Sequence, residues 1–428
     1  MLIYLSESKL FQENDHINRP RIFYGWIIVM AGMGIHFWIS FAWMYGIQVF
    51  FNPILNTFGW SRAAISGAFS LQRLEGSIIT PIEGYLVDRF GPRKMVLFGV
   101  FIVGCGLISM WKLQNIYMFY VCVLTISLGV SASIGIPRNW AIVQWFKRLR
   151  GRALGIGATG AAFSGPMTFI LVILVEWIGW EKSFLILGIL TWLICLPLGF
   201  LYRGKPEEYG LLPDGDSQKS QNDNPLITRK QSNETLTQDG MTPIQALKTR
   251  AFWTLVLIFA FQTMGVSGML IHQVPYFESV GFSKQESVSV LAMFTMLSLI
   301  GRVGGGWLFD FVEKRFSLAL LMLSQSIAFI ILANITSYWQ AIPFSLFFGM
   351  SFGGMMPARG VMISTYFGTR YFGTIQGLSQ SATVISGVIS PLLMGYMFDI
   401  YGSYMGAVYV IVVCSVLGIP LCFSLKKT

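Results

Sequence analysis

The chain has 428 residues, of which 54% are hydrophobic and only 12% charged, and its mean hydropathy is +0.62. A soluble globular protein carries about 25% charged residues, so this composition excludes a soluble fold. Apolar runs close to the roughly 20 residues that a helix needs to cross a bilayer recur along the whole length. We therefore expect an all-α membrane protein with many spans.

The apolar runs place twelve transmembrane helices. The predicted spans are 23–50, 63–87, 95–111, 117–145, 153–176, 183–202, 252–277, 287–309, 317–336, 341–366, 373–397 and 403–425. The first twenty residues mix charged and short apolar pieces, so we expect a tail and an anchoring first span, without a cleavable signal peptide.

The positive charges predict the orientation. When the N-terminus is placed in the cytoplasm, most of the 30 Lys and Arg residues fall on that side, and few lie in outer loops. This excess predicts a cell-membrane protein with both termini cytoplasmic. It also accounts for the net charge of +10 without nucleic acid as a partner.

A polar segment divides the chain into two halves. Residues 203–250 are rich in Gly, Pro, Asn, Gln, Ser and acids, and cannot fill a core. The predicted organisation is therefore a cytoplasmic tail (1–22), a six-helix half (23–202), a cytoplasmic linker (203–250) and a second six-helix half (251–428). Near the end of the linker, Thr242 as N-cap and Pro243 at the first helical position predict a short surface helix.

The two halves are related in sequence. At an offset of 222 residues many positions match, among them Gly84 with Gly306, Asp88 with Asp310, Gly151 with Gly373, Gly155 with Gly377, and Gly165 with Gly387. Duplicated halves of six spans are typical of a transporter whose binding site lies between them.

The stretch "GYLVDRFGPRKMVL" (84–97) joins the second and third spans. It resembles the signature loop of the major facilitator superfamily, with Pro92 inserted, and Gly306–Arg315 is a degenerate second copy. The resemblance implies that Asp88 and its basic neighbours, with Asp310 in the second copy, clamp the two halves together on the cytoplasmic side. The expected clamp residues are Asp88, Arg89, Arg93, Lys94 and Asp310.

Three further stretches narrow the family. "WFKRLRGRALGIGATGAAFSG" (145–165) resembles the fifth-span entry of monocarboxylate porters, and its small residues allow close helix packing. "FGWSRAAISGAFSL" (58–71) and "YFGTRYFGTIQG" (366–377) resemble bacterial oxalate/formate-antiporter-like relatives. The resemblance implies a transporter for small organic anions.

Arg302 is the most informative charge within a span. It lies eight residues before Asp310, so about 12 Å from the cytoplasmic end of its helix and close to the membrane midplane. Monocarboxylate porters carry an arginine here that binds the substrate carboxylate, and the resemblance implies that role for Arg302. The alternative is a permanent ion pair with a protein acid.

The family pattern is only partly kept. Proton-coupled porters have an aspartate where this chain has Ser298, and often a lysine where it has Tyr45. Dicarboxylate-exchanging relatives have a lysine in span eleven, which contains none here. A single cationic partner therefore favours a monoanion over oxalate, and proton coupling stays open.

Other polar residues within the spans are candidates for the site. His36 and Glu75 each lie about 20 Å from the cytoplasmic side and could face each other, which makes them candidates for proton coupling. Tyr45 and His36 are also candidate substrate-binding residues. Arg138 and Arg359, each close to a proline, are expected as a pseudo-symmetric pair nearer the cytoplasm, in a gate or helix-end pairing.

These features predict a secondary transporter that moves a small organic monocarboxylate by alternating access. We expect it to use neither a metal nor a cofactor. No phosphate-cradling loop and no cluster of catalytic residues occurs in the sequence, so we expect no enzyme. Two alternatives stay open: a proton-driven exporter of apolar or cationic compounds that uses Glu75 or Glu83, and a non-transporting nutrient sensor. We expect a monomer in the lipid bilayer, with a small organic anion as its substrate. Whether protons are also carried stays open.

Overall fold

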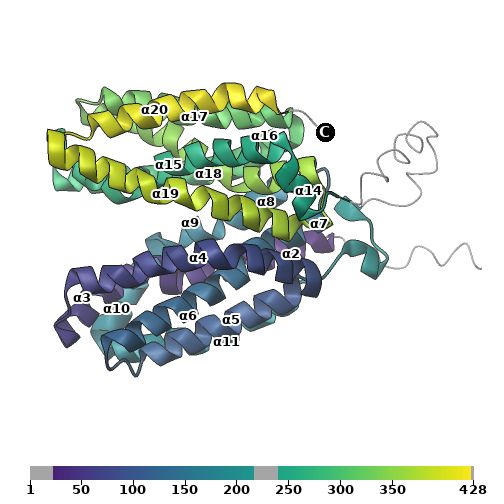
Figure 1. Cartoon of the computed structure of the whole chain (residues 1–428). Coiled ribbons are helices and arrows are strands. Elements are labelled where there is room, and N and C mark those ends of the chain that lie inside the picture. Colours follow the sequence, from purple (N-terminus) through teal and green to yellow (C-terminus); the bar gives the residue numbers. More distant parts are fainter. Residues whose placement is uncertain (1–22, 216–239, 426–428) are drawn as a thin grey trace, which may run out of the picture.

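A computed structural model describes residues 23–215 and 240–425. The chain folds into two helical lobes that lie side by side (Figure 1). The first lobe contains α2 (Tyr24–Ile39), α3 (Ile47–Phe58), α4 (Arg62–Phe90), α5 (Pro92–Met110), α6 (Ile116–Ile134), α7 (Ile136–Trp145), α8 (Arg150–Ala158), α9 (Gly160–Ser164), α10 (Phe169–Ile178) and α11 (Trp180–Phe200). The second contains α15 (Arg250–Ser279), α16 (Lys284–Phe311), α17 (Lys314–Ala333), α18 (Ala341–Phe367), α19 (Phe372–Tyr401) and α20 (Met405–Ser424).

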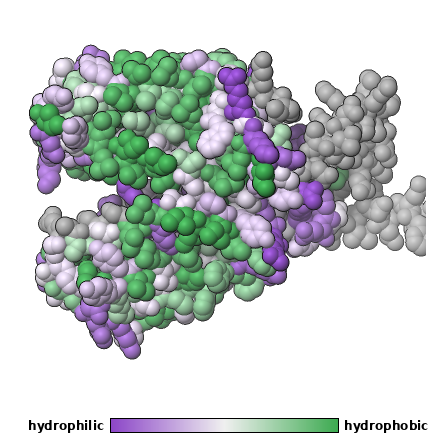
Figure 2. Space-filling model, in the orientation of Figure 1, coloured by the Kyte–Doolittle hydropathy of each residue, from purple (hydrophilic) through white to green (hydrophobic). Residues whose placement is uncertain are grey.

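The outer surface of both lobes suits lipid. Figure 2 shows large hydrophobic areas on each lobe, and side chains such as Trp177 and Ile78 are 83% and 69% exposed. In the described part of the chain, eleven helical segments are long and apolar enough to cross a membrane. An apolar outer surface on helices of this length identifies a multi-span membrane protein.

Helix α4 is the remaining span, and it differs in composition. It is 29 residues long and carries Arg73, Glu75, Glu83 and Asp88 within that length. It packs against α6 in its own lobe and against α19 in the other. We count it as the twelfth span because it lies between α6 and α19, with Glu83 buried against α6 and Asp88 bonded to the start of α19, whereas Arg73 is exposed.

The predicted spans all correspond to helical segments, most of which begin earlier or end later than the apolar runs, whereas the last, Met405–Ser424, is shorter than the predicted 403–425. The first span ends at Phe58 where the sequence predicts residue 50, because polar residues such as Gln48 and Asn52 shorten the apolar run without ending the helix. Helix α14 (Pro243–Lys248) confirms the predicted linker helix: the Thr242 hydroxyl accepts a hydrogen bond from the Gln245 amide, and Gln245 Oε1 accepts one from the Thr242 amide.

Three spans of the first lobe are broken near mid-membrane. A π-helical turn (Ser40–Met44), followed by Tyr45 and Gly46, separates α2 from α3. Gly135 separates α6 from α7, and the span that begins at Arg150 is interrupted after Ala158 and again before Phe169. Interrupted helices offer unpaired carbonyls to polar groups within a membrane, and they mark binding sites in transporters.

We call the end of the bundle that carries α14 the linker end and the opposite end the far end (Figure 1). The α4–α5 turn at Gly91 and the α7–α8 loop lie at the linker end, and the α3–α4 turn at Gly59 lies at the far end. The predicted tail 1–22, part of the linker (216–239) and residues 426–428 lie outside the described residues.

Candidate functional site

Asp88 joins the two lobes at the linker end. Its Oδ1 accepts hydrogen bonds from the Gly373 amide at 2.9 Å and from Trp140 Nε1 at 2.9 Å. Its Oδ2 accepts from the Thr374 amide at 2.8 Å and from the Thr374 hydroxyl at 2.7 Å. Gly373 and Thr374 begin α19, so the carboxylate of one lobe caps the helix N-terminus of the other, where negative charge is favourable.

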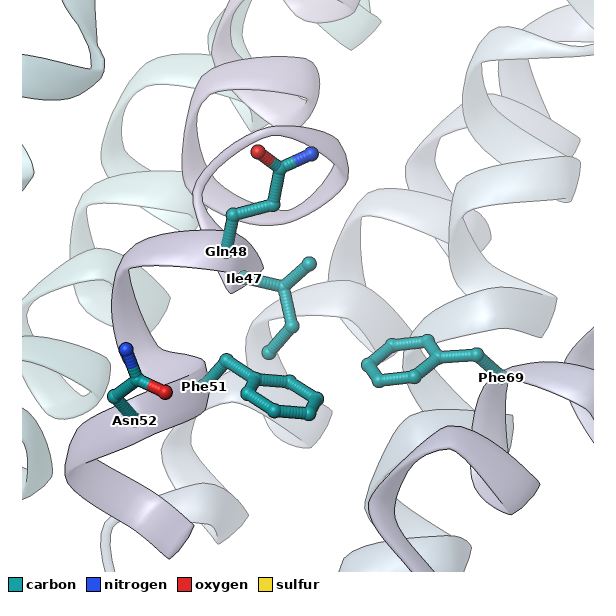
Figure 3. A pocket seen from close by; sticks show the side chains of 5 residues that line it. All are labelled: Ile47, Gln48, Phe51, Asn52 and Phe69. Carbon is teal, nitrogen blue, oxygen red and sulfur yellow. The ribbon is translucent and has the colours of Figure 1, made fainter. Parts of the chain in front are cut away.

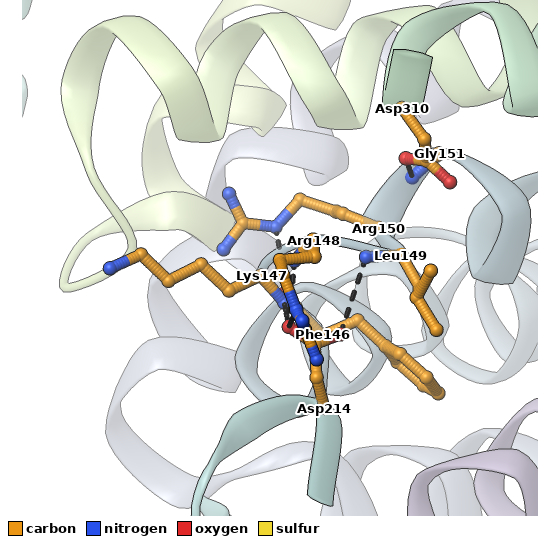
Figure 4. Close-up of polar contacts among 8 residues, drawn as sticks. All are labelled: Phe146, Lys147, Arg148, Leu149, Arg150, Gly151, Asp214 and Asp310. Atoms are coloured by element: carbon orange, nitrogen blue, oxygen red, sulfur yellow. Dashed lines mark hydrogen bonds and ion pairs between the residues drawn. The ribbon is translucent and has the colours of Figure 1, made fainter. Parts of the chain in front are cut away.

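Asp310 makes the equivalent contact from the second lobe. Its Oδ1 accepts from the Gly151 amide at 2.7 Å and its Oδ2 from the Arg152 amide at 3.0 Å, at the start of α8 (Figure 4). Arg152 Nε also lies 3.3 Å from Oδ2. The offset of 222 residues relates both carboxylates and both helix starts, so the linker end has two symmetric carboxylate clamps.

Glycines let the helices approach at each clamp. A Cβ added at Gly84 would fall on the carbonyl of Gly373, and one added at Gly306 would fall on the carbonyl of Gly151. One turn further in, Gly377 packs on the Thr80 carbonyl and Gly155 on the Arg302 carbonyl. The offset also relates these contacts, so backbone-to-backbone packing closes the linker end.

The basic residues of the signature loop do not take part in this closure, which corrects the sequence expectation. Arg89 Nη1 donates to the Tyr85 hydroxyl at 3.3 Å, and the Arg93 guanidinium lies 5.2 Å from the centroid of the Phe200 ring. Lys94 is exposed. Their aromatic partners belong to the first lobe, because helix-start amides already satisfy the Asp88 carboxylate and leave little for a cation to pair with.

Sequence reasoning missed two further residues that join the lobes. Arg150 Nη1 donates to the Ser364 hydroxyl at 3.0 Å, and Gln144 Nε2 donates to the Thr369 carbonyl at 2.8 Å. Both contacts connect the α7–α8 region with the end of α18. The loop before Arg150 is itself held by Asp214 of the linker, which accepts from the Arg148 amide at 2.7 Å (Figure 4).

The lobes separate toward the far end. Ser381 Oγ donates to the Ser77 carbonyl at 2.5 Å, and beyond this contact a hollow of about 420 Å³ lies between α4 and α19. Figure 2 shows the surface hollowed between the lobes at this end. A second hollow of about 330 Å³ has the amides of Gln48 and Asn52 on its wall, with the rings of Phe51 and Phe69 (Figure 3). The structure is therefore closed at the linker end and open at the far end.

Arg302 is buried between the lobes, at the C-terminal end of α8. Its side chain is 1% exposed, and its Nη1 donates to the Ala158 carbonyl of the first lobe at 2.9 Å. Its Nε has no hydrogen-bond partner among the described residues. A guanidinium has five N–H donors, so most of this donor set is unused. Within residues 23–215 and 240–425, no carboxylate forms an ion pair with Arg302.

Arg138 lies beside Arg302, which sequence reasoning did not expect. Its Nη1 lies 2.6 Å from His36 Nδ1 and donates to the Gly157 carbonyl at 3.2 Å, and its Nη2 donates to Asn139 Oδ1 at 3.1 Å. The carbonyls of Gly157 and Ala158 are consecutive at the C-terminal end of α8. The negative end of this helix therefore holds both guanidiniums.

His36 serves Arg138 in this structure and does not meet Glu75. Because a guanidinium can only donate, His36 Nδ1 accepts, and the imidazole is neutral with its proton on Nε2. Glu75 instead lies near the Ser127 hydroxyl on α6. The two residues have similar depth, but their side chains point to different neighbours, so the possible contact between them is not formed.

Tyr45 lies at the outer side of these charges. It follows the π-helical turn of the first span and is an electrostatic neighbour of Arg302. The hollow of Figure 3 begins two residues later, at Ile47. We call Arg302, Arg138, His36 and Tyr45 the arginine site. It carries two guanidiniums that only neutral groups contact within the described residues.

Arg359 lies apart from the arginine site. Both of its terminal nitrogens lie 3.3 Å from Thr383 Oγ1, and its guanidinium lies 4.6 Å from the centroid of the Phe259 ring. All three residues belong to the second lobe. The structure therefore does not place Arg138 and Arg359 in one cluster: Arg138 belongs to the arginine site, and a gating role for Arg359 stays a prediction.

Two lobes related by the 222-residue offset, joined at one end and with buried charges between them, have the architecture of a membrane transporter. The family profile of the Major Facilitator Superfamily matches residues 32–338, and the chain belongs to this superfamily. It is a secondary transporter and not an enzyme, and the resemblance seen in the sequence is confirmed.

Relatives and solved structures agree with this assignment. Monocarboxylate transporter 12 of Xenopus laevis is 24% identical over 422 residues, which cover 94% of this chain and 89% of that protein. The oxalate:formate antiporter of Oxalobacter formigenes is 28% identical over 251 residues, 57% of this chain and 53% of that protein. The crystal structure of the transporter FucP in the outward conformation shares the fold, with a TM-score of 0.70, 15% identity, and coverage of 95% of this chain and 100% of that one.

Proposed function

We propose that this transporter carries a small organic monocarboxylate, such as lactate, pyruvate or formate, across the cell membrane. The observation that carries the proposal is Arg302: a guanidinium 1% exposed, with an unpartnered Nε and no ion pair to a described carboxylate. A planar fork of donors binds a carboxylate through two parallel hydrogen bonds. The names of the relatives, a monocarboxylate transporter and an oxalate:formate antiporter, point to the same substrate class.

The remaining parts of the site support an anion. Arg138 is an electrostatic neighbour of Arg302, and most of its own donors are already used by His36, Gly157 and Asn139. It therefore adds positive charge near the substrate while Arg302 supplies the hydrogen bonds. Tyr45 borders the bound anion on the side of the far-end hollow.

Alternating access follows from the clamps. With the linker end closed, the anion reaches Arg302 from the far end, which we assign to the outside because most positive loop charges lie at the linker end. Release on the other side requires Asp88 to leave the start of α19 and Asp310 to leave the start of α8. Because Arg302 also bonds across the lobes to Ala158, this contact must break in the same movement.

A dicarboxylate is a second candidate, and Arg138 is the observation that favours it. The sequence argument for a monoanion relied on a single cation in the site, and this premise is wrong because Arg138 and Arg302 are neighbours. A dianion such as oxalate would balance both charges. A cationic substrate is disfavoured, since it would have to approach two guanidiniums in a medium of low dielectric constant.

The test is exchange in proteoliposomes that contain the purified protein. Labelled lactate, pyruvate, formate and oxalate are each exchanged against the same unlabelled anion, with protein-free vesicles as the blank. We expect protein-dependent exchange of at least one monocarboxylate. Arg302→Lys should weaken its apparent affinity about tenfold or more, because an ammonium keeps the charge and loses the two-pronged geometry.

Arg93→Lys is the matched control, since Arg93 lies on Phe200 away from the arginine site; its exchange should equal that of the wild type. Preference for oxalate over every monocarboxylate would select the second candidate. Exchange of none of the four anions would contradict the proposal and favour the exporter or the sensor.

A further inference from the structure

The first part of the linker folds against the first lobe and ends in a buried carboxylate. Asp214 Oδ2 accepts hydrogen bonds from the Lys147 amide at 3.0 Å and from the Arg148 amide at 2.7 Å, and its Oδ1 accepts one from the Leu149 amide at 3.3 Å (Figure 4). Only 1% of the Asp214 side chain is exposed. The sequence predicts residues 203–250 only as a polar connection between the halves, and a mere connection needs no buried, fully engaged acid.

The backbone at Asp214 is held in an unusual conformation. Its φ is +60°, and among the described residues it is the one non-glycine residue with a positive φ. This left-handed conformation is unfavourable for residues with a Cβ, and aspartate and asparagine tolerate it best. Gly215 follows with φ +73° and lies so close to Phe23 that an added Cβ would be 2.9 Å from the ring. The turn therefore holds the carboxylate in one place.

Contacts with the first lobe also fix the linker segment before this turn. Trp145 Nε1 donates a hydrogen bond to the Gly204 carbonyl at 2.7 Å, and the Arg203 guanidinium lies 3.7 Å from the centroid of the Tyr24 ring. Trp145 is the last residue of α7, and Tyr24 is the first residue of α2. Asp214 therefore belongs to the first lobe and moves with it.

The three amides that Asp214 binds lead directly into the contact between the lobes. Helix α8 begins at Arg150, and Asp310 of the second lobe accepts hydrogen bonds from the next two amides. The Arg150 side chain donates to the Ser364 hydroxyl of the second lobe at 3.0 Å. The backbone of residues 147–152 thus binds one carboxylate of its own lobe and one of the opposite lobe.

Helix α8 connects these contacts with the arginine site. It has 9 residues and is about 13 Å long at 1.5 Å per residue. The carbonyls of Gly157 and Ala158 near its end accept hydrogen bonds from Arg138 and Arg302. Because the span is interrupted after Ala158, α8 is a short rod. The direction in which its start is held therefore affects both the contact with Asp310 and the carbonyls of the arginine site.

We propose that Asp214 is a positioning residue for closure: it orients the start of α8 so that Asp310 and Ser364 can bind there when the linker end closes. Because Asp214 and α8 belong to the same lobe, their hydrogen bonds remain when the lobes separate, whereas those of Asp310 break. The linker is then part of the closing contact and more than a tether. The inference rests on the opening and closing described for the proposed function, and not on which substrate is carried.

The experiment measures how often the linker end opens in the purified full-length protein. Leu154 on α8 is 2% exposed and packs against Gly360 of α18, so a cysteine at this position is covered while the linker end is closed. The rate at which a water-soluble maleimide labels Leu154→Cys, measured on the labelled peptide by mass spectrometry, follows the open fraction. Native Cys195 is buried in α11 of the same lobe, and its labelling in the same samples reports unfolding.

Asp214→Asn removes the charge and one of the two accepting oxygens, and asparagine still tolerates the left-handed turn. We expect this substitution to raise the labelling rate of Leu154→Cys about tenfold, with the labelling of Cys195 unchanged. Asp214→Gly also tolerates the turn but removes both oxygens, so it should raise the rate further. Glu207→Gln neutralises an exposed carboxyl of the same linker segment. It is the matched control and should leave the labelling rate unchanged.

Two double variants test whether Asp214 acts through Asp310. Asp214→Asn should have a smaller effect in an Asp310→Asn background than in an Asp88→Asn background, because Asp88 binds the start of α19 and not that of α8. Equal effects in the two backgrounds would overturn the proposal.

Two further results would contradict it. One is an unchanged labelling rate of Leu154→Cys in Asp214→Asn. The other is a parallel rise in the labelling of Cys195, which would make Asp214 a residue of the general fold. None of these measurements needs an exchanged anion, so the test remains decisive even if the proposed substrate class is wrong.

Discussion

Helices α4 and α16 occupy equivalent places in the two lobes, and they are alike at one end and different in the middle. At the linker end Gly84 and Asp88 on α4 match Gly306 and Asp310 on α16, and each pair closes on a helix start of the opposite lobe. In the interior the equivalent of Arg302 is Thr80, and the equivalent of Glu83 is Gly305.

This difference separates the moving parts from the binding parts. A two-fold contact can open and close evenly only when both lobes keep the same residues there. A substrate has no such symmetry, so the interior positions are free to differ. On our account, α16 supplies the cation that holds the anion, and α4 has Thr80 in its place.

The largest loss is expected where a side chain would enter a backbone contact. Gly155→Ala would place a Cβ on the Arg302 carbonyl, and Gly377→Ala would place one on the Thr80 carbonyl. Both should hold the linker end apart and lower proteoliposome exchange at least tenfold, because packed backbones cannot yield easily. The controls are Gly304→Ala on α16 and Gly76→Ala on α4, where nothing lies within 4 Å of the added carbon. Equal loss in the controls would mean that helix packing does not set closure.

Removing one clamp charge should have the next largest effect. Asp88→Asn removes the charge and one of the two accepting oxygens, so two of the four donors lose their acceptor; Asp310→Asn removes the acceptor of one amide and the ion pair with Arg152. Hydrogen bonds to charged groups contribute about 1.5–3 kcal/mol, so each substitution should shift the conformational equilibrium roughly tenfold, Asp88→Asn more than Asp310→Asn. Exchange rates should fall while the anion dissociation constant stays within about twofold. A fall in affinity alone would contradict the clamp role.

The smallest effect is expected for the basic residues of the signature loop. Arg93→Ala and Arg89→Ala remove contacts with Phe200 and Tyr85 in the same lobe. Exposed contacts of this kind contribute about 1 kcal/mol or less, so exchange should change less than twofold. A loss of exchange as large as that of Asp88→Asn would mean that Arg89 and Arg93 do help to close the linker end.

The sequence predicts the scaffold well because the scaffold is set by local patterns. Apolar runs define the spans, Thr242 and Pro243 define the linker helix, and the offset of 222 residues finds both clamp aspartates. The site was less predictable. Depth along a helix can be counted, but the side that a residue faces cannot be read from a helix that is apolar all round.

Arg138 and His36 illustrate this limit. The break at Gly135 starts α7 three residues before Arg138, and the end of α8 at Ala158 supplies the carbonyls that bring Arg138 beside Arg302. If the span were one continuous helix, as the sequence predicts, nothing would indicate that Arg138 lies beside Arg302. The glycine-rich stretch around residues 155–160 was the one available signal that helices and polar groups come close together there.

The central claim, that Arg302 holds the substrate and no protein acid, is tested most directly by melting temperatures of the purified wild type and Arg302→Ala. Both are measured with and without the carboxylate that the wild type exchanges. We predict that the substrate-free variant is at least as stable as the wild type, since it loses a costly buried charge, and that the anion raises Tm only in the wild type. A fall in substrate-free stability corresponding to about 3–5 kcal/mol, recovered by neutralising Glu75 or Glu83, would contradict the claim and make Arg302 half of a structural ion pair.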